Sequence, residues 1–390
     1  MNQDNLDDNE EQHGLPDPSN QQLEPIQDYS SPKSARIDPE IIEEIEDERP
    51  KIPVGLLTRD YKDMLIERGF LGLYRWYVAR SQLTRNWNPD KDFNWRAFRK
   101  DHSPEVQRVL EGFFAVEQYV PDYVTSLLQV IRQSHGRSHF HIRWGSEEEK
   151  HADLWYNSVL FSEHRSPKWL RDYMGQLRGR AWSIPWEDPM HMIFYTVFQE
   201  RATQVNYLNM AAIARGETGK PGFEGDVDPV LAEMSKVIAI DEAAHYNFFL
   251  EGARLYLYYY PTKAIEAMHD VITHFAMPAG HLIPDYNKFA EVVARLGIYG
   301  PREHSRDVVQ HALNNLGFAG RKALENGIKR GRMVPDENGN MRETAIFEAI
   351  DFPSIADKVK RIFGRIRTHE DEIGFSDVDP TEFQQNYERM

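Results

Sequence analysis

Two Glu-x-x-His pairs and two further glutamates are the residues of this sequence whose types and spacing could do chemistry. They are Glu148 with His151, Glu242 with His245, and the separate residues Glu117 and Glu200. On a helix, residues i and i+3 share a face, so each pair would present a carboxylate and an imidazole in one direction. Four carboxylates and two histidines from four helices are the ligand set of a di-iron carboxylate bundle. Two bridged iron ions can activate O2, so the pattern predicts chemistry as well as a fold.

The order of these residues separates the pattern from chance. With 62 acidic residues and 15 histidines in 390 positions, an acid-x-x-His match arises roughly two or three times at random. Here a lone glutamate and a Glu-x-x-His pair alternate twice, at intervals of 31, 52 and 42 residues (117 to 148, 148 to 200, 200 to 242). Each interval fits the rest of one helix, a connection and the start of the next. The alternative is surface glutamates and satisfied histidines on ordinary helices.

The charge of this ligand set suits a buried pair of iron ions. Iron in this role needs oxygen ligands, a nitrogen for each metal, and positions left open for O2. Two ferrous ions balance four carboxylates, whereas six buried ionisable groups without metal would be costly. Apolar neighbours of the two pairs predict a dry shell around the site; they are Leu154, Trp155, Ile238, Ile240, Phe248 and Phe249.

Two polar residues are candidates to act beside the ligands. Thr203 lies three residues after Glu200, so its hydroxyl should face the metals and could manage protons or bond to a bound oxygen species. An equally good interpretation is a helix threonine bonded to the carbonyl four residues back. Asp241 could accept a proton from a ligand histidine and fix its tautomer, or be a surface acid.

Residues on the other side of Glu200 are candidates to line a substrate tunnel. They lie one and two turns before it on the same face, and they are Met192, Ile193 and Thr196. Core packing alone would also place them there.

Composition limits the class of protein. The length fits one large domain or two, and 41% hydrophobic residues support a substantial core. The absence of cysteine excludes disulfides, thiol catalysis and Fe–S clusters held by this chain. We find no apolar run long enough for a membrane span, no basic stripe for nucleic acid, and no signal or transit sequence, which predicts a cytoplasmic protein.

The negative charge is concentrated at the N-terminus. Residues 1–50 hold fifteen acids against Lys33, Arg36 and Arg49, so they carry −12 of the net −16. They are also poor in aromatics, which predicts an acidic disordered tail over 1–55, with a short helix possible at 39–48. The tail is either a docking or solubility segment or inert.

The rest of the chain has helical spacing of apolar residues, which predicts an all-α four-helix bundle with additional helices. We expect a bundle domain over 56–320 and a C-terminal extension over 321–390 that packs on it. The predicted helices are 61–83, 103–133, 146–163, 166–180, 190–215, 229–260, 261–276, 286–296, 303–316 and 341–367.

Two local features leave alternatives. Pro121 cannot donate a hydrogen bond to the Glu117 carbonyl, so it either kinks the helix one turn past Glu117 or starts a new helix. The stretch 132–145 is predicted to be a loop. Its histidines, His135, His139 and His141, lack nearby carboxylates and helical register, so we do not assign them to a metal site.

Seven segments resemble the soluble acyl-acyl-carrier-protein desaturases in that family's order. SEEEKHADL (146–154) and IDEAAHYNF (240–248) resemble its two Glu-x-x-His helices, and VEQYVPDY (116–123) and FQERAT (198–203) its two glutamate segments. NWNP (86–89), AMPAGHL (276–282) and ARLGIYG (294–300) are similar to segments outside the ligand set. The resemblance covers about residues 60–315.

The resemblance implies a homodimer with a ferritin-like fold and two iron ions per subunit. Such a protein uses O2 and electrons from ferredoxin to place a cis double bond in a long acyl chain, carried as a thioester of acyl carrier protein or of coenzyme A. It gives Glu117, Glu148, His151, Glu200, Glu242 and His245 the metal-ligand roles. Thr203 takes the oxygen-side hydroxyl role, and Trp87 and Asp241 take roles on the electron route.

Departures from the family keep other functions open. Met192 replaces a small residue beside the tunnel, and the part beyond 320 matches poorly. The alternatives are another di-iron oxidase or hydroxylase acting on a carried acyl chain, and a non-enzymatic iron-binding bundle. A ribonucleotide reductase radical subunit is disfavoured, because Trp155 stands where its tyrosine is expected.

Two basic clusters could dock an acidic carrier protein. One is Lys168, Arg171, Arg178 and Arg180, and the other is Lys358, Lys360, Arg361, Arg365 and Arg367. Solvated helix faces are the alternative.

Overall fold

The computed structural model describes residues 57–217, 224–336 and 339–373. These residues all belong to one compact unit. The predicted tail at 1–55 and its short helix at 39–48 lie outside the described residues. They stay predictions, as does the division of the chain into domains at 320.

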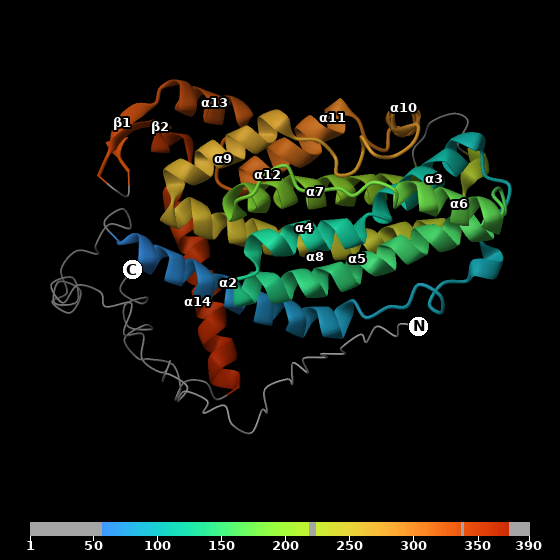
Figure 1. Ribbon diagram of the computed structural model, residues 1–390, viewed down its shortest axis with the longest axis horizontal. Coiled ribbons are helices and arrows are strands. Elements are labelled where there is room, and N and C mark those ends of the chain that lie inside the picture. Colours follow the sequence, from blue (N-terminus) through green and yellow to red (C-terminus); the bar gives the residue numbers. More distant parts are fainter. Residues whose placement is uncertain (1–56, 218–223, 337–338, 374–390) are drawn as a thin grey trace, which may run out of the picture. The chain divides into compact units, whose positions relative to one another are not determined.

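Helices dominate the described residues, which confirms the all-α class (Figure 1). The α-helices are α2 (Arg59–Thr84), α3 (Pro104–Glu117), α4 (Val120–Ile131), α5 (His135–Phe161), α6 (Pro167–Leu177), α7 (Pro189–Ala214), α8 (Pro229–Tyr259), α9 (Pro261–His274), α10 (Tyr286–Leu296), α11 (Pro301–Glu303), α12 (His311–Asn315), α13 (Arg321–Lys329) and α14 (Phe352–Glu372). The other elements are the short turns η3 (Trp95–Ala97), η4 (Glu224–Asp226) and η6 (Phe347–Ala349), the π-helix η5 (His304–Gln310), and the strands β1 (Arg332–Pro335) and β2 (Met341–Thr344).

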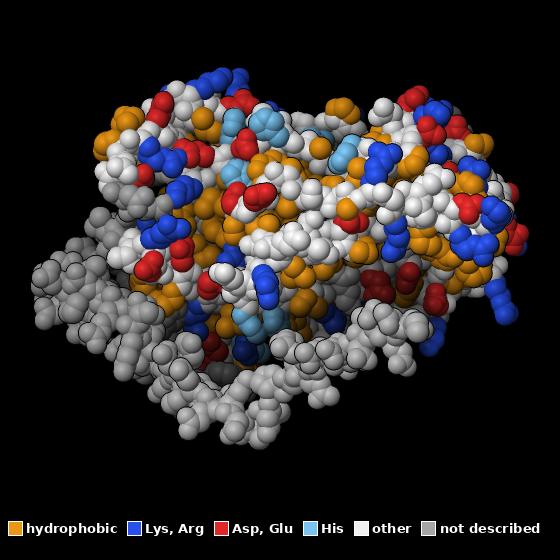
Figure 2. All heavy atoms as spheres, in the orientation of Figure 1, with side chains coloured by type: hydrophobic (Ala, Val, Ile, Leu, Met, Phe, Trp, Pro, Cys, Tyr) orange, Lys and Arg blue, Asp and Glu red, His pale blue; other side chains and the backbone are white. Residues whose placement is uncertain are grey.

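A bundle of long helices forms the centre of the unit. Figure 1 shows α4, α5, α7 and α8 running side by side, and α7 packs along α8 over much of its length. Helix α3 packs on α5, α2 packs on α5 and α8, and α14 crosses α2 and α8 from the C-terminal part of the chain. Basic and acidic side chains are interspersed over the face of the described residues that Figure 2 shows.

The starts of the ligand helices follow from local sequence. Ser103, Asp188 and Asp228 each accept hydrogen bonds from backbone N–H groups in the first turn of a helix, and each directly precedes a proline. A capping side chain satisfies N–H groups that have no helical partner, and proline fits the first helical position. These caps fix where α3, α7 and α8 begin, and so which faces turn inward.

Glycines let α2 approach its neighbours closely. A Cβ placed on Gly69 would lie 2.6 Å from Leu255 Cδ1 of α8, and one on Gly72 would lie 1.9 Å from Ile366 Cγ1 of α14. A side chain at either position would therefore force Leu255 or Ile366 to move, so the two glycines allow α8 and α14 to pack closely against α2.

Helix α3 ends at the first predicted ligand. Glu117 is its last residue, and α4 begins at Val120 with Pro121 in its first turn. Of the two alternatives for Pro121, the start of a new helix is therefore confirmed.

Two predictions about local structure were wrong. The stretch 132–145 is the first half of α5, which begins at His135 rather than at 146. Residues 341–344 form β2, paired antiparallel with β1 from Arg332↔Thr344 to Pro335↔Met341, and the helix predicted at 341–367 is α14, displaced toward the C-terminus.

No helix of the described residues is long and apolar enough to cross a membrane.

Candidate metal centre

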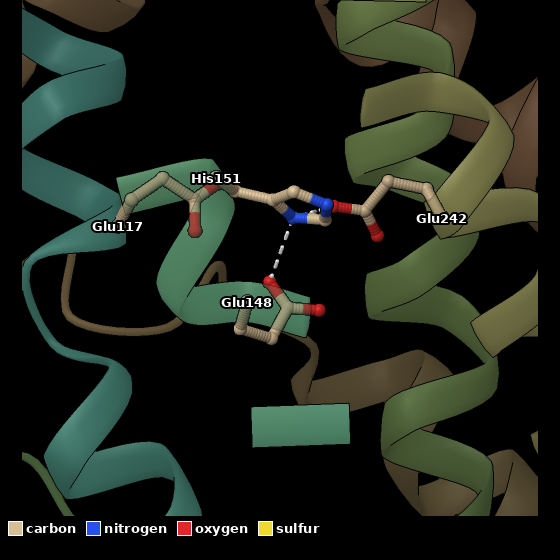
Figure 3. A group of neighbouring side chains, drawn as sticks. All are labelled: Glu117, Glu148, His151 and Glu242. Atoms are coloured by element: carbon tan, nitrogen blue, oxygen red, sulfur yellow. Dashed lines mark hydrogen bonds and ion pairs between the residues drawn. The ribbon is translucent and has the colours of Figure 1, made fainter. Parts of the chain in front are cut away.

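The six predicted ligands come together in the middle of the bundle. Helix α3 supplies Glu117 and α7 supplies Glu200, while α5 and α8 each supply a Glu-x-x-His pair. All six side chains are buried, with at most 4% of any residue exposed. Figure 3 shows four of them, Glu117, Glu148, His151 and Glu242, pointing toward one another across the space between the helices.

The ligands form two overlapping clusters. One consists of Glu117, Glu148, His151 and Glu242, and the other of Glu148, Glu200, Glu242 and His245. In each cluster the donor atoms lie within 4.8 Å of one another. Because Glu148 and Glu242 belong to both, the arrangement is that of two neighbouring metal positions bridged by two carboxylates, each with one histidine and one further glutamate.

Both histidines turn Nδ1 toward the carboxylates. His151 Nδ1 lies 3.1 Å from Glu148 and 3.5 Å from Glu242. His245 Nδ1 lies 3.0 Å from Glu148 and 3.3 Å from Glu200. The Nε2 atoms point outward, so the inward nitrogens are the atoms available to metal.

The inward atoms fit metal ligation better than hydrogen bonding. Both oxygens of Glu200, Oε1 of Glu148 and Nδ1 of His245 make no hydrogen bond of acceptable geometry among the described residues, although all are buried. Unpaired buried polar atoms are costly and need an explanation. Oxygen-rich sites with one imidazole per metal suit iron and similar divalent ions, so two cations account for these atoms.

Burial makes the clustered charges unfavourable without cations. Burial, and then the Glu148 charge, raise the pKa of Glu117 to about 8. Burial likewise raises the pKa of Glu200, and it raises that of Glu242 well above its usual range. Burial opposes the charge on His151, but Glu148 and Asp241 raise its pKa to about 9. Metal cations would let all four carboxylates ionise together.

Asp241 and Trp87 meet at the outer side of His151. The Trp87 indole N–H donates to Asp241 Oδ2 over 3.0 Å, and the same oxygen lies 3.3 Å from His151 Nε2. The indole stacks on the His151 ring with 6.1 Å between centroids. Asp241 thus occupies the place predicted for it, against a ligand histidine.

A second hydrogen-bonded group of side chains, which the sequence reasoning missed, contacts the outer nitrogen of His245. Glu147 Oε2 is 3.0 Å from His245 Nε2, and Glu147 also accepts hydrogen bonds from Tyr77 and Ser81 of α2. The available signal was its position, because Glu147 directly precedes Glu148 just as Asp241 directly precedes Glu242. Its partners on α2 are some seventy residues away in the sequence, so the residues next to Glu147 do not indicate these contacts.

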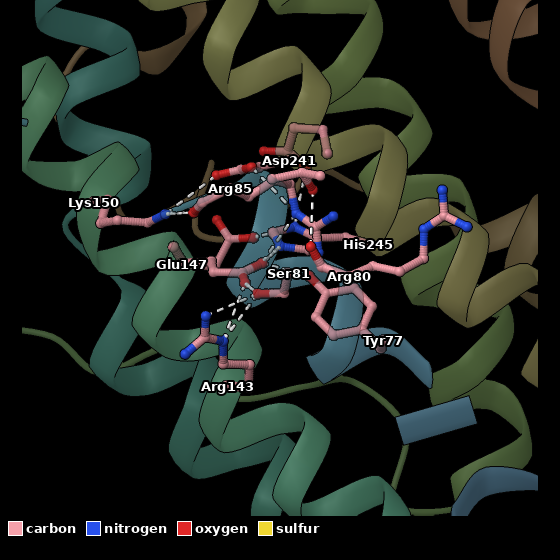
Figure 4. Close-up of polar contacts among 12 residues, drawn as sticks. Tyr77, Arg80, Ser81, Arg85, Arg143, Glu147, Lys150, Asp241 and His245 are labelled. Carbon is pink, nitrogen blue, oxygen red and sulfur yellow. Dashed lines mark hydrogen bonds and ion pairs between the residues drawn. The ribbon is translucent and has the colours of Figure 1, made fainter. Parts of the chain in front are cut away.

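Arg85, at the end of α2, lies between Asp241 and Glu147, the two carboxylates that contact the ligand histidines. Its Nε lies 3.4 Å from Asp241 and 3.8 Å from Glu147 (Figure 4). The side chain is buried, so its charge balances two carboxylates that water does not reach. Lys150 approaches Asp241 from the other side, at 3.6 Å.

Thr203 and Tyr207 contact the carboxylates from α7. Thr203 Oγ1 lies 2.7 Å from Glu242 Oε2, and it also lies within reach of the Gln199 and Glu200 carbonyls. Tyr207, one turn on, donates to Glu117. The tyrosine was missed, although it lies seven residues after Glu200 and so on the same face.

An apolar pocket of about 450 Å³ opens beside these two residues. Its walls come from α3, α7, α10 and the segments around 276 and 300, and they include Phe113, Val116, Asn206, Phe289, Tyr299 and His304. The predicted tunnel residues Met192, Ile193 and Thr196 are buried but do not line this pocket. Their assignment stays a prediction.

The dry shell is present with one exception. Trp155, Leu154, Ile238, Phe248 and Phe249 are fully buried, but Ile240 is 50% exposed. Its prediction was wrong because two residues before Glu242 is about 200° around the helix, which turns Ile240 to solvent.

The chain is similar to several known proteins. A family model described as fatty acid desaturase matches residues 89–336. DesA1 of Mycobacterium tuberculosis, named as an acyl-acyl-carrier-protein desaturase, is 24% identical over 237 residues, 59% of this chain and 64% of its own length. A chloroplastic stearoyl-acyl-carrier-protein 9-desaturase of Arabidopsis thaliana is 30% identical over 206 residues, 49% of this chain and 50% of its own.

The match to these curated relatives spans about half to two thirds of their length. Among solved structures, DesA2 of Mycobacterium tuberculosis is similar with a TM-score of 0.48 and 19% identity, over 67% of this chain and 98% of that one.

Proposed function

Because the chain belongs to the fatty acid desaturase family, whose model matches residues 89–336, we propose that it is an O2-dependent desaturase of long acyl thioesters. The observation that supports this most is the convergence of four glutamates and two histidines, all buried, beside an apolar pocket. A storage bundle would need the ligands, but it would have no use for an apolar pocket lined by Thr203 and Tyr207, which contact two of them.

The six candidate ligands divide between two iron positions. Glu117 and His151 would hold one ion, Glu200 and His245 the other, and Glu148 and Glu242 both. Iron bound there would activate O2 and pass electrons to it. In the net reaction, a saturated chain, O2, two electrons and two protons give a cis-unsaturated chain and two waters.

The protein's own side chains would hold the substrate and supply polar contacts. The pocket beside Thr203 would take part of the acyl chain, since its walls are mainly apolar and aromatic. Thr203 lies at the boundary between this pocket and Glu242, where its hydroxyl can give or accept a proton. Tyr207 would keep Glu117 in one orientation through its hydrogen bond.

The remaining parts of the proposal concern partners. We propose an acyl carrier protein as the carrier of the chain, with coenzyme A as the alternative, and ferredoxin as the electron donor. The functional unit would be a cytoplasmic homodimer. Relatives named as acyl-acyl-carrier-protein desaturases support the first of these.

A single-turnover experiment tests the proposal. The full-length protein is loaded with iron, reduced chemically, mixed with C10–C18 acyl thioesters of both carriers and exposed to O2; the fatty acids are then analysed by mass spectrometry. We expect one monounsaturated product with a defined double-bond position. Glu148→Ala, which removes a shared ligand, is expected to abolish both iron binding and product.

Other outcomes separate the alternatives. A hydroxylated product would support a different oxidase on the same site. Consumption of O2 without product, accompanied by accumulation of ferric mineral, would support iron storage. Loaded and reduced protein that yields neither would reject the desaturase.

A further inference from the structure

A basic groove lies between α2 and α14, away from the metal site. It has a volume of about 660 Å³ and is lined by residues of these two helices. Arg80 comes from α2, and Lys360, Arg361 and Arg365 come from α14, with His369 beside them. Glu372 is the acid in the lining, and Asp357 lies 3.9 Å from Lys360. The groove therefore carries a clear positive excess.

Trp76 connects the two sides of the groove. The guanidinium of Arg80 lies 5.2 Å from the Trp76 ring centroid, and that of Arg365 lies 5.1 Å from it. Within the described part of the chain, neither arginine has an acidic partner. Two cations held against one half-buried indole are available for a partner that supplies the missing negative charge.

The other face of α2 touches the metal site. Tyr77, next to Trp76, and Ser81 both donate to Glu147, which contacts His245. In Figure 4 the Tyr77 side chain points into this cluster, whereas that of Arg80 points away from it. A single helix, about 10 Å across, thus separates the groove from the residues that hold a metal-ligand histidine.

The groove is poorly placed to deliver an acyl chain. The pocket beside Thr203 is walled by α3, α7, α10 and the segments around 276 and 300, and the groove by α2 and α14, so the two have no element in common. Figure 1 shows α10 and α11 on one side of the bundle and α2 on the opposite side. A carrier that inserts an acyl chain must dock at the pocket, which leaves the groove for another partner.

The surface around Trp87, the other route to a ligand histidine, carries mixed charge. Asp90, Asp92, Glu149 and Asp153 are exposed there, but Lys91 is exposed as well, and Lys150 Nζ lies 4.2 Å from the Trp87 ring centroid. An acidic protein is attracted more strongly to the groove, where basic side chains predominate.

We propose that the groove between α2 and α14 docks an acidic one-electron carrier protein that reduces the metal site. This inference rests on the proposed function and names the surface for its electron donor. Each reduced carrier loses one electron to the site and leaves oxidised, so two docking events supply one desaturation.

Binding of an acidic [2Fe–2S] ferredoxin to the full-length protein tests the proposal. Affinity is measured by calorimetry at low and at raised salt, with no acyl substrate present. For the double variant Arg361→Glu/Arg365→Glu we expect a loss of about tenfold or more and a weaker salt dependence. The neutral pair Arg361→Gln/Arg365→Gln is expected to lie between this variant and wild type.

The basic cluster that includes Lys168 and Arg171 provides a matched control. Lys168→Glu/Arg171→Glu reverses two exposed charges on α6, where Lys168 already pairs with Asp172. It should leave ferredoxin affinity unchanged, and circular dichroism checks that every variant is folded. Equal losses in both clusters, or no loss in the groove variant, would overturn the proposal.

Two further measurements separate this inference from the function it rests on. Affinity for an acyl carrier protein should not change when the groove is reversed; its loss would assign the groove to the acyl carrier instead. If chemically reduced protein makes product but the groove variant binds ferredoxin as tightly as wild type does, only the docking surface is wrong. If ferredoxin docks there but loaded protein makes no product, the desaturase function is wrong.

Discussion

At the scale of single residues, the outward nitrogens of the ligand histidines decide how firmly the site is held. His151 Nε2 faces Asp241 and His245 Nε2 faces Glu147, at 3.3 and 3.0 Å. A carboxylate in this place keeps the proton on Nε2 and leaves Nδ1 free to bind metal. Both histidines are therefore oriented alike, and each keeps its Nε2 proton when Nδ1 gives up its own proton to bind metal.

Replacing Asp241 by asparagine should weaken metal binding. The amide can present its NH2 group to His151 Nε2, which would favour the wrong tautomer. We expect roughly a 10- to 100-fold loss of affinity for one ferrous ion, measured by competition with a chelator. Asp172→Asn, at an exposed position on α6, is the control. Unchanged affinity in the Asp241 variant would show that Asp241 does not orient the histidine.

Thr203 should affect the efficiency of the reaction rather than metal content. Thr203→Val keeps the shape of the side chain but removes the hydroxyl that contacts Glu242. With a hydrogen bond worth about 1 kcal/mol, product formed per O2 consumed should fall about fivefold. Thr203→Ser keeps the hydroxyl and should stay near wild type. If valine and serine give equal yields, the hydroxyl has no part in the chemistry.

At the scale of elements, the sequence predicted the ligand helices because their signals are local. Apolar spacing, capping residues such as Asp188 and Asp228, and the Glu-x-x-His pairs all act within a few turns. The start of α5 was missed, although Ser134 caps it by accepting a hydrogen bond from the Arg137 N–H. Its glycines resemble loop residues. A Cβ on Gly136 would lie 2.5 Å from the Leu71 backbone, so this glycine is needed for close packing against α2 rather than for a loop.

Gly145 tests this explanation within α5. Alanine favours a helix over glycine by roughly 1 kcal/mol, but a Cβ at Gly145 would lie 2.4 Å from Val124 Cγ2 of α4. We expect Gly145→Ala to destabilise the protein by about 1–3 kcal/mol in urea unfolding. A Cβ on Gly175 of α6 would meet no atom within 4 Å, so Gly175→Ala should be stabilising. Stabilisation by both substitutions would contradict the packing argument.

At the scale of the whole molecule, residues distant in sequence complete the site. Tyr77, Arg85, Glu147 and Tyr207 touch ligands or their partners, but each is an ordinary helix residue when considered alone. The six candidate ligands could be selected from the sequence because a repeated motif and a family resemblance point to them, and the structure brings their side chains together. The supporting residues depend on how α2 and α7 pack, which local spacing does not encode.

A buried carboxylate that links α3 to the segment after α5 should make stability depend on pH. Burial raises the pKa of Glu111, but His164 and Arg165 outweigh it and lower the pKa from 4.5 to about 2. Since the folded pKa is lower than the unfolded one, this stabilisation is present above pH 4.5 and is lost as pH falls toward 2.

Glu111→Gln should remove that part of the pH dependence. We expect the free energy of unfolding at neutral pH to fall by about 1–2 kcal/mol, less than the full shift implies because solvent screens the pair. The difference between wild type and variant should shrink between about pH 4.5 and about pH 3, as measured by urea unfolding. A difference that is constant over this range would exclude the ionic origin.

The last turn of α2 ties both halves of the metal site to one short stretch of backbone. The Arg85 N–H donates to the Ser81 carbonyl over 3.0 Å, and Lys150 donates to the Arg85 carbonyl over 2.9 Å. If this turn frays, Glu147 and Asp241 lose a common counter-charge in the same event. Amide hydrogen exchange at residues 81–85 should therefore follow the rate at which bound metal dissociates, and both ions should leave together.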